Sequence, residues 1–414
     1  MRQSCYHNMN FEAILRHKIK FSLWAMLRPL QIKRLRSKKK IKVLFLVCDL
    51  TCWKSEKLFK EMQEHPRFEP VIGVFEAIEI PNSHVAVINY CSHNGFNYIF
   101  LSPDKTIKQQ VGADLVFYQK PYVDHYPPKL QYNRNLNVLQ SYLSYGSNSI
   151  LNYTFLHNLM FEPLWQLFFE NSIIAKESKS LSWHNGKNIV VTGVPVMDEL
   201  NSPKSEYHDP WLDHSGRKRI IYAPHHTFGN DHMEGLQCGT FLETGWEILR
   251  LAKKYQEDVF FAFKPHPLLR KKLNLLWGEE KTNEYFGEWE TLENAQVENG
   301  VYIGLFKYSD AMIHDCNAFT LEYLTMDKPV MFLVKDDNLT NNMNTIFKMA
   351  HEQHYREKVT EDIEGFIKNV INGNDPMSES RKSFVAQALK PPYGKTASRN
   401  IINAILGIEE YKNN

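Results

Sequence analysis

Polar side chains follow three apolar segments in the second half of the chain, and their types could bind a metal ion or an anion. The segments are RKRIIYAPHHTFGN at 217–230, DVFFAFKPHPLLR at 258–270 and SDAMIHDCN at 309–317. Each apolar run is typical of a buried strand, so the polar residues stand where a strand ends. They are His225, His226, Lys264, His266, His314, Asp315 and Asn317.

Metal binding is the first chemistry that these residue types allow. Histidine and aspartate are ligands for zinc and related ions, and Asp231 and His232 add two more in the same stretch. The spacing matches no metal-binding motif, and the HExxH pattern is absent. Adjacent His225 and His226 are also expected to point in different directions if the segment is extended. We therefore predict no metal ion and no other cofactor.

Phosphate binding fits the same residues better. A helix that begins after a strand offers N–H groups and the positive end of its dipole to an anion. Lys264 and His266 stand just ahead of a helix predicted from about Leu268. Pro267 suits the first turn of that helix, where the missing N–H costs nothing.

The segment DCNAFTLEYL at 315–324 predicts a second helix start. Asp315 can cap this helix, Asn317 can donate a hydrogen bond, and Glu322, about two turns in, suits the hydroxyls of a ribose. Each motif alone is more often an ordinary loop. Three of them in order favour a ligand site, and the charge and the carboxylate together predict a nucleotide-diphosphate donor.

These motifs need parallel strands that end at one edge of a sheet. KKIKVLFLVCDL at 39–50 is a charged lead with a continuous apolar run, which is typical of a buried parallel strand. Strands and helices alternate from there until a polar gap at 198–219, and the alternation then restarts. In the first half we expect strands at 68–75, 97–101 and 113–119, helices at 54–65, 83–93 and 157–169, and further apolar segments at 136–143, 171–177 and 187–195. In the second half we expect strands at 219–224, 259–265, 300–304, 309–315 and 328–334, helices at 240–255, 268–276 and 318–325, and helices from 360 on.

The alternation predicts an α/β fold of two doubly wound, Rossmann-like lobes with a cleft between them. The predicted parts are a basic arm (1–40), an N-terminal lobe (41–200), a C-terminal lobe (215–390) and a final helix (391–414). Ligands of such sheets bind beyond the carboxyl ends of the strands. The three polar segments are therefore expected to converge on one site in the C-terminal lobe.

The composition indicates a globular protein with a basic N-terminal arm. A chain of 414 residues suggests two domains, and a hydrophobic content of 43% is enough to fill their cores. The six cysteines form no CxxC pair, which predicts free thiols in a reducing cytoplasm. Residues 1–42 hold twelve Lys/Arg and one acidic residue, whereas the rest hold 37 basic and 46 acidic side chains. Because the excess charge is confined to the arm, we expect no nucleic acid as a partner.

The basic arm mixes positive charge with large apolar side chains. Its longest uncharged run, Phe21 to Leu27, is too short to span a bilayer, and the pattern is not that of a signal peptide. We expect an amphipathic segment on an anionic membrane surface, with Trp24 and the Leu and Ile side chains inserted. A basic helix packed on its own domain and a disordered leader are the alternatives.

The three segments, taken in order, resemble the CDP-glycerol glycerophosphotransferase family, which includes teichoic-acid-type polymerases and related capsule-synthesis enzymes. The similar stretches are IIYAPHHT, FAFKPHP and SDAMIHDCNAFTLEYLTMDKPVMFLV, preceded by VVTGVPVMDEL. The resemblance covers about 188–335 and rests before that on TCWKSEKLF at 51–59 and the strand order.

The resemblance implies a GT-B fold in which the C-terminal lobe holds a nucleotide donor, the N-terminal lobe holds the acceptor, and the final helix crosses back to the N-terminal lobe. It further implies transfer of glycerol phosphate from CDP-glycerol to a lipid-linked or polymer acceptor. CMP would be released on the inner, cytoplasmic face of the cell membrane, where the protein would be peripheral.

The resemblance also implies roles for single residues. The family's pattern has acidic residues at Asp315 and Glu322, but serines where this chain has Asn317 and Ala318. The YAPHHT stretch departs too, since Thr-Trp is the commoner form after this proline. The transfer itself needs a base and groups that stabilise charge on the leaving phosphate. On that ground the predicted catalytic residues are Asp49, just past the first strand, as the base from the opposite lobe, with His125 as the second choice, and His225 and His266 at the phosphates. The predicted donor-binding residues are His226, Lys264, His314, Asp315, Asn317 and Glu322.

Two other functions stay open from the sequence. A glycosyltransferase of the same fold with a nucleotide-sugar donor would present much the same strand ends. A non-catalytic relative that binds nucleotide or polymer is consistent with the absent serines. Nucleotide release from a panel of donors separates these three functions.

Overall fold

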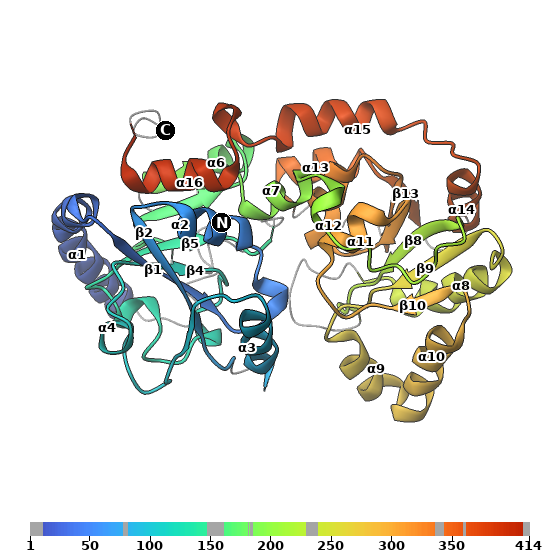
Figure 1. Ribbon diagram of the computed structural model, residues 1–414, viewed down its shortest axis with the longest axis horizontal. Helices are drawn as coiled ribbons and strands as arrows, with labels where there is room; N and C mark the ends of the chain where they lie inside the picture. The colour runs from blue at the N-terminus through green and yellow to red at the C-terminus, as the bar shows by residue number, and fades with distance from the viewer. Residues whose placement is uncertain are drawn as a thin grey trace. The chain divides into compact units, whose positions relative to one another are not determined.

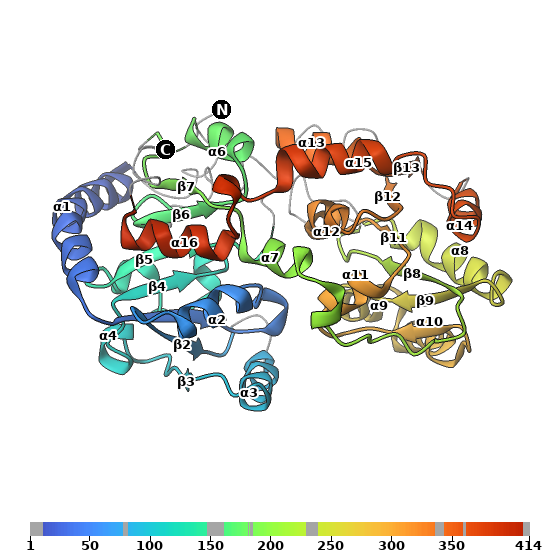
Figure 2. The ribbon, with the colours of Figure 1, turned by 45° about the horizontal axis from the view of Figure 1, so that its top comes forward.

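The computed structural model describes residues 11–77, 82–146, 161–180, 182, 185–228, 239–335, 343–358 and 362–408. The chain forms two compact units (Figure 1, Figure 2). The first unit consists of residues 1–199 and 391–414, and the second consists of residues 200–390. No helix in the described ranges is both long and apolar enough to cross a lipid bilayer.

The first unit is built on a 7-stranded parallel sheet with the strand order β3-β2-β1-β4-β5-β6-β7. The chain therefore winds outward from β1 in one direction and then, from β4, in the other. Most strand residues are buried on both faces of the sheet, which explains their continuous apolar runs. The strands are β1 (Ile41–Val47), β2 (Phe68–Val74), β3 (Tyr98–Phe100), β4 (Leu115–Tyr118), β5 (Leu139–Leu143), β6 (Gln166–Phe169) and β7 (Ile189–Val191).

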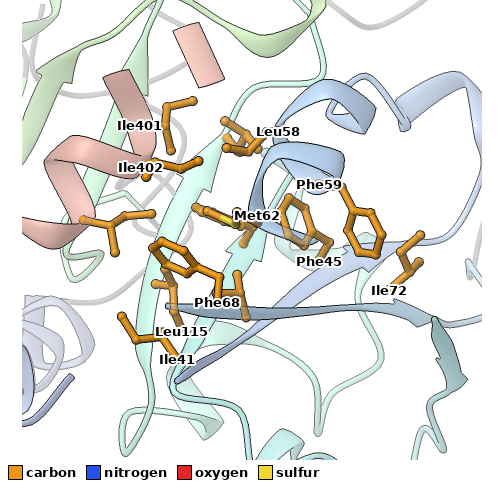
Figure 3. Close-up of a cluster of buried hydrophobic side chains, with 14 of the residues drawn as sticks. Ile41, Phe45, Leu58, Phe59, Met62, Phe68, Ile72, Leu115, Ile401 and Ile402 are labelled. Atoms are coloured by element: carbon orange, nitrogen blue, oxygen red, sulfur yellow. The ribbon is translucent and has the colours of Figure 1, made fainter. Parts of the chain in front are cut away.

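Helices of the first unit include the last helix of the chain, which packs beside α2. Figure 3 shows Ile401 and Ile402 of the last helix in the same apolar cluster as Leu58 and Met62 of α2. Full burial of one such side chain stabilises a fold by about 1.5–3 kcal/mol. The helices are α1 (Phe11–Ser37), α2 (Glu56–Glu64), α3 (Ser83–His93), α4 (Ile107–Gln110), α6 (Ser172–Lys179), α7 (Pro195–Asn201, which ends in the second unit) and α16 (Ala397–Leu406), with 3₁₀ turns η2 (Leu50–Cys52), η3 (Val123–His125) and η4 (Tyr132–Arg134).

Both ends of α16 are held by side chains from distant parts of the sequence. The carboxylate of Asp198 accepts hydrogen bonds from the first two N–H groups, those of Ala397 (2.8 Å) and Ser398 (2.7 Å). At the other end the Arg36 guanidinium donates to the carbonyls of Ala404 and Ile405. A negative group at the N-terminus and a positive group at the C-terminus each lie beside the opposite partial charge of the helix dipole, so both contacts stabilise the helix. These contacts fix the end of the chain on the first unit.

The basic arm forms the long helix α1, and one side of it packs on the first unit. Phe21 and Trp24 are buried, and the Trp24 indole N–H donates to the Leu136 carbonyl. The expectation that Trp24 inserts into a membrane is therefore wrong. The exposed apolar side chains of α1 lie on a different side, at Ile19, Met26, Leu27 and Leu30.

The second unit is built on a 6-stranded parallel sheet with the strand order β10-β9-β8-β11-β12-β13. The winding reverses between β8 and β11, as it does between β1 and β4 in the first unit. Its strands are β8 (Lys218–Ala223), β9 (Val259–Phe263), β10 (Ala295–Val297), β11 (Ala311–His314), β12 (Val330–Val334) and β13 (Tyr355–Lys358). Its helices are α8 (Phe241–Lys254), α9 (Leu269–Trp277), α10 (Glu279–Thr291), α11 (Ile303–Tyr308), α12 (Asn317–Glu322), α13 (Thr345–His351), α14 (Ile363–Ile371) and α15 (Ser378–Phe384), with 3₁₀ turns η5 (Lys204–Glu206), η6 (Tyr323–Met326) and η9 (Pro392–Gly394, in the first unit) and the π-helical stretch η8 (Val385–Leu389).

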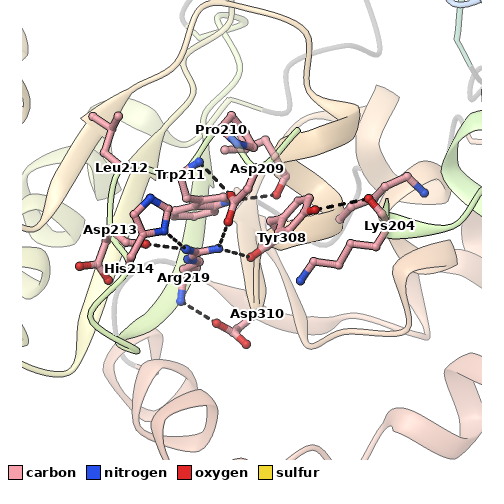
Figure 4. Close-up of polar contacts among 12 residues, drawn as sticks. Lys204, Asp209, Pro210, Trp211, Leu212, Asp213, His214, Arg219, Tyr308 and Asp310 are labelled. Carbon is pink, nitrogen blue, oxygen red and sulfur yellow. Dashed lines mark hydrogen bonds and ion pairs between the residues drawn. The ribbon is translucent and has the colours of Figure 1, made fainter. Parts of the chain in front are cut away.

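The amino end of the second sheet is tied to the polar segment that precedes it. The Arg219 guanidinium forms an ion pair with Asp209 (2.8 Å) and also donates to the Asp213 carbonyl (Figure 4). The backbone N–H of Arg219 donates to the Asp310 carboxylate, just ahead of β11. The segment at 209–213 is thus ordered against the sheet edge opposite to the one that carries the histidines.

Three expected elements differ from the structure. The helix expected at 157–169 includes strand β6, because a short apolar run buried on both faces has no periodicity that separates strand from helix; residues 157–160 lie outside the described ranges. Residues 171–177 lie in helix α6, which the Asn171 side chain caps through the N–H groups of Ile173 and Ile174. The strand expected at 300–304 is the start of α11, and the edge strand β10 precedes it.

Candidate functional site

The point where the winding of the second sheet reverses places the three polar segments at one edge. Strand β8 lies between β9 and β11, and all three run in parallel, so their carboxyl ends meet at the same side. His225 follows β8, His266 follows β9 and Asp315 follows β11. The reversal point of a doubly wound sheet is the usual place for a ligand.

Three histidine rings gather at this edge. The ring centroids of His226 and His266 lie 4.1 Å apart, those of His225 and His226 4.5 Å, and those of His225 and His266 4.8 Å. The expectation that the two adjacent histidines point apart is wrong, because the chain bends at His226 instead of staying extended. The sequence motifs at the ends of β8 and β9 therefore form one cluster.

Asp315 holds the cluster in place. Its carboxylate accepts hydrogen bonds from the backbone N–H of His225 (2.5 Å), from the backbone N–H of Thr240 (2.6 Å) and from the Thr240 hydroxyl (2.9 Å). The residue is buried, and burial raises the pKa of Asp315 to about 7 against these hydrogen bonds. Both carboxylate oxygens are engaged inside the protein, which gives Asp315 a positioning role, and its contact with the donor stays a prediction.

A hydrogen bond that the His266 ring accepts fixes which ring nitrogen carries the proton when the ring is neutral. The Leu268 backbone N–H donates to Nδ1 of His266 at 3.1 Å, so the neutral ring carries its proton on Nε2. An Nε2–H group donates to an anion. A histidine that binds a metal through Nε2 instead needs its proton on Nδ1, where it donates to a neighbouring acceptor.

A metal ion is thus the weaker interpretation of the cluster. Within the described ranges, His225, His226 and His266 are the one group of histidine, cysteine and acidic side chains close enough to share an ion, with ligand atoms within 4.8 Å of one another. The tautomer of His266 favours an anion over a cation at this position. Two further candidate ligands from the sequence, Asp231 and His232, lie outside the described residues.

One ring of the cluster, that of His225, carries no positive charge near neutral pH. Burial, with the nearby His226 and Lys272, lowers the pKa of His225 to about 3, so its ring is neutral near pH 7. Lys264 donates to the Gly300 carbonyl at 2.8 Å. Lys272 in α9 is the cation whose field reaches His225, and the sequence analysis missed it. Its position in the stretch KPHPLLRKK, in the first turn of the helix that follows the histidine, was the signal that could have found it.

Two predicted donor-binding residues lie inside the core. His314 is 0% exposed, its Nδ1 bonds the Cys316 carbonyl at 3.1 Å, and its ring packs on Phe332. This enclosure argues against a contact with the donor, and the role of His314 stays a prediction. Glu322 is also 0% exposed and accepts a hydrogen bond from the Tyr302 hydroxyl at 2.6 Å, so its contact with a ribose stays a prediction.

The corresponding edge of the first sheet holds a buried ion pair. Asp49 follows β1 and Lys120 follows β4, the two strands between which the winding reverses. Lys120 Nζ lies 2.6 Å from Asp49 Oδ2. Burial would raise the pKa of Asp49, but the charge of Lys120 and hydrogen bonds from Lys120, Thr51 and Cys52 outweigh it, and the pKa is lowered. The sequence analysis missed Lys120, although its place just past a predicted strand was the same signal that identified Asp49.

A lowered pKa makes Asp49 a weaker base than an ordinary aspartate as long as the pair is closed. The second choice, His125, ends the 3₁₀ turn at Val123–His125 and stacks on Tyr122 with ring centroids 4.5 Å apart. His125 is partly buried. The assignment of the base to either residue stays a prediction.

The part of the sequence that contains this site matches a known protein family. The family model of CDP-glycerol:poly(glycerophosphate) glycerophosphotransferases matches residues 169–407, which is more than half of the chain. This range takes in all three polar segments and the histidine cluster. No curated protein matches the sequence.

Solved structures share the fold at low sequence identity. A protein from Listeria monocytogenes described as a UDP-N-acetylglucosamine 2-epimerase has a TM-score of 0.57 at 16% identity, covering 90% of this chain and 98% of its own. The wall teichoic acid polymerase TagF has a TM-score of 0.55 at 16% identity, covering 94% and 96%. A TagF variant soaked with CDPG has a TM-score of 0.53 at 15% identity, covering 95% and 96%. At such identities the likeness establishes the fold alone. The predicted α/β fold of two Rossmann-like lobes is confirmed.

Proposed function

Because the chain belongs to the CDP-glycerol:poly(glycerophosphate) glycerophosphotransferase family, we propose that it transfers glycerol phosphate from CDP-glycerol to a hydroxyl of a polymer or lipid-linked acceptor. The acceptor oxygen forms a bond to the phosphorus that carries the glycerol. The bond between that phosphorus and the bridging oxygen breaks, and CMP leaves with the electron pair. The proton of the acceptor hydroxyl passes to a base.

The histidine cluster is the observation that carries this proposal. Negative charge grows on the CMP phosphate as the bridging bond breaks, and preorganised hydrogen-bond donors stabilise such charge. His266 is oriented as a donor by the Leu268 N–H, and His225 is held by Asp315. A donor that is oriented before the substrate arrives needs no reorganisation during the reaction. Lys272 adds positive charge beside them.

The ion pair in the first unit suggests how a base becomes available. Asp49 takes up a proton readily only when Lys120 no longer neutralises it. An acceptor that ends in glycerol phosphate carries a negative phosphate, and this phosphate can attract Lys120 in place of the carboxylate. We therefore propose that a phosphate-bearing acceptor, by binding, frees Asp49 to serve as the base.

A donor panel tests the proposed function. The purified protein is incubated with a poly(glycerophosphate) acceptor and with CDP-glycerol, CDP-ribitol or UDP-N-acetylglucosamine, and the released nucleotide is measured. We expect release of CMP from CDP-glycerol and lengthening of the acceptor. Turnover of the nucleotide sugar would favour a glycosyltransferase instead. Binding of CDP-glycerol without any release of CMP would favour a non-catalytic relative.

Helix α1 supports a membrane-surface location as part of the proposal. Its exposed apolar side chains Ile19, Met26, Leu27 and Leu30 recur with helical spacing, so they share one side of the helix. Exposed Lys33 and Arg34 follow on the same side. Apolar groups beside cations fit an anionic lipid surface. We therefore propose that this side of α1 contacts the inner face of the cell membrane, near a lipid-linked acceptor.

A further inference from the structure

Asn317 is a buried amide whose two polar atoms have no hydrogen-bond partner within the described part of the chain. The residue is 7% exposed, and neither Oδ1 nor Nδ2 finds a donor or acceptor there. Buried polar groups in folded proteins are almost always hydrogen-bonded, so an exception needs an explanation. A bound ligand that supplies the missing partners is one such explanation.

The position of Asn317 points to a ligand at the histidine edge. It is the first residue of α12 and follows β11, the strand that pairs with β8 in the sheet. Asp315, two residues earlier, bonds the backbone of His225. The amide therefore stands at the same strand ends as the proposed donor site.

The chemistry of the amide narrows the group that it binds. An asparagine offers a carbonyl oxygen that accepts and an NH₂ that donates. A phosphate oxygen only accepts, so it satisfies the NH₂ and leaves the carbonyl oxygen without a donor. A hydroxyl group both donates and accepts. Resting on the proposed function, we propose that Asn317 is a specificity-determining residue that binds a hydroxyl of the donor, on its ribose or on its glycerol.

Binding measurements separate the two hydroxyl sources. The affinity of the wild type and of Asn317→Ala is measured calorimetrically for CDP-glycerol, CDP and 2′,3′-dideoxy-CDP. The variant is expected to bind CDP-glycerol about tenfold more weakly, the effect of one or two lost hydrogen bonds. A glycerol contact predicts this loss for CDP-glycerol alone. A ribose contact predicts it for CDP-glycerol and CDP but not for the dideoxy nucleotide.

Other outcomes overturn the inference. An equal loss with the dideoxy nucleotide means that the amide contacts phosphate or base, and no loss with any ligand means that it contacts none of them. Unliganded Asn317→Ala is expected to be as stable to heat as the wild type or more so, because it loses a buried polar group that has no partner. A clear fall in its melting temperature would mean that the amide is structural.

Asn294 provides a matched control in the same unit. It is also buried, at 1% exposed, but its NH₂ donates to the carbonyls of Ala252 (3.0 Å) and Val259 (2.9 Å). Asn294→Ala is therefore expected to lower the melting temperature and to leave nucleotide affinity unchanged.

Failure of the proposed function has a different signature. If the wild type binds UDP but neither CDP-glycerol nor CDP, the donor is wrong, and the same comparison with UDP and 2′,3′-dideoxy-UDP decides the role of Asn317. If the wild type binds no nucleotide, both proposals are overturned.

Discussion

The donor character of His266 is a consequence of one backbone hydrogen bond. The N–H of Leu268 occupies Nδ1, which leaves the proton on Nε2 and fixes the orientation of the ring. The backbone N–H of the neighbouring His225 donates to Asp315, and its ring forms a hydrogen bond between Nδ1 and the Thr227 hydroxyl. The side chains at this edge are thus oriented by the loops that carry them, and the charge comes from Lys272 nearby.

Replacement of His266 tests this donor role. We expect His266→Ala to lower kcat by about 10²–10³, the usual effect of removing one donor to a developing anion. His266→Gln should recover part of the loss, because the glutamine amide can place an N–H near the position of Nε2. Rates of CMP release check both variants, with melting temperatures close to that of the wild type as the control. Loss of wild-type activity with a chelator, and no recovery with glutamine, would instead support a metal ion.

Asp315 is expected to act through the loops that it joins. Asp315→Ala leaves the N–H groups of His225 and Thr240 without their acceptor, and each buried group so left costs about 1–3 kcal/mol. We therefore predict a lower melting temperature and a lower kcat, with a smaller effect on KM for the acceptor. Thermal unfolding and initial rates measure these effects. Unchanged stability would contradict the positioning role.

At the scale of elements, the capped ends of α16 and the exposed side of α1 lead to testable predictions about stability and lipid binding. Helix α16 supplies apolar side chains to the core of the first unit, although nearly the whole second unit separates it in sequence from that core. Its caps, Asp198 and Arg36, come from elements that the chain forms much earlier. Helix α1 likewise buries one side and exposes another.

The cap on α16 is open to a direct test. Asp198→Ala is expected to lower the free energy of unfolding of the first unit by about 1–2 kcal/mol, because two N–H groups at the helix start lose their acceptor. Urea denaturation measures the change. The exposed Asp104 gives the control, since Asp104→Ala should change stability little. Equal effects of the two replacements would argue against the cap.

The exposed side of α1 predicts lipid binding. Met26→Glu combined with Leu30→Glu should weaken binding to phosphatidylglycerol vesicles by about tenfold or more, because two apolar side chains can no longer enter the lipid surface. Ala25→Glu adds a negative charge to another side of the same helix and should have a smaller effect. Vesicle co-sedimentation compares the variants, with phosphatidylcholine vesicles as the neutral reference. Binding unchanged in the double variant would contradict the proposed membrane contact.

At the scale of the whole molecule, buried histidines make the stability of the second unit depend on pH. The core of the second unit contains His314, His351 and His354, which are at most 2% exposed. Burial lowers the pKa of His314 to about 3 and that of His351 to about 4, and it also lowers the pKa of His354. Arg356 and Arg381 are cationic neighbours that act in the same direction. In the unfolded chain these histidines titrate near 6.5.

The lowered pKa values of these histidines determine how the stability of the second unit changes with pH. Below about pH 6.5 the unfolded chain binds protons that the folded unit does not, so stability falls as the pH falls. Each such histidine can cost up to about 1.4 kcal/mol per pH unit between the two pKa values. His351→Phe removes one of them and keeps an aromatic ring beside Phe332. The stability of this variant relative to the wild type should rise as the pH is lowered from 7.5 to 5, in urea titrations at each pH. A difference that does not change with pH would mean that His351 titrates in the folded unit as it does in the unfolded chain.

Much of the architecture is local information, and for that reason it was predictable. Apolar runs of strand length, separated by helical patterns, gave most strands and helices near their observed bounds, and the rule that ligands bind at strand ends gave the location of the candidate site. The failures were also local. At β6 a run buried on both faces carries no period, and at α6 a capping asparagine outweighed the apolar residues after it.

The sequence by itself determined that this chain has two α/β lobes and that His225, His226 and His266 stand at strand ends. The spacing of buried residues and the positions of turn-forming residues are local features of the sequence, so short stretches are enough to predict both. Only the tertiary structure decided how the predicted site residues are packed and paired. It turned His314 into the core, engaged both oxygens of Asp315 and paired Asp49 with Lys120. It also buried Trp24 and left the Asn317 amide without a partner in the described chain. These outcomes depend on contacts between residues far apart in sequence, which no local pattern encodes.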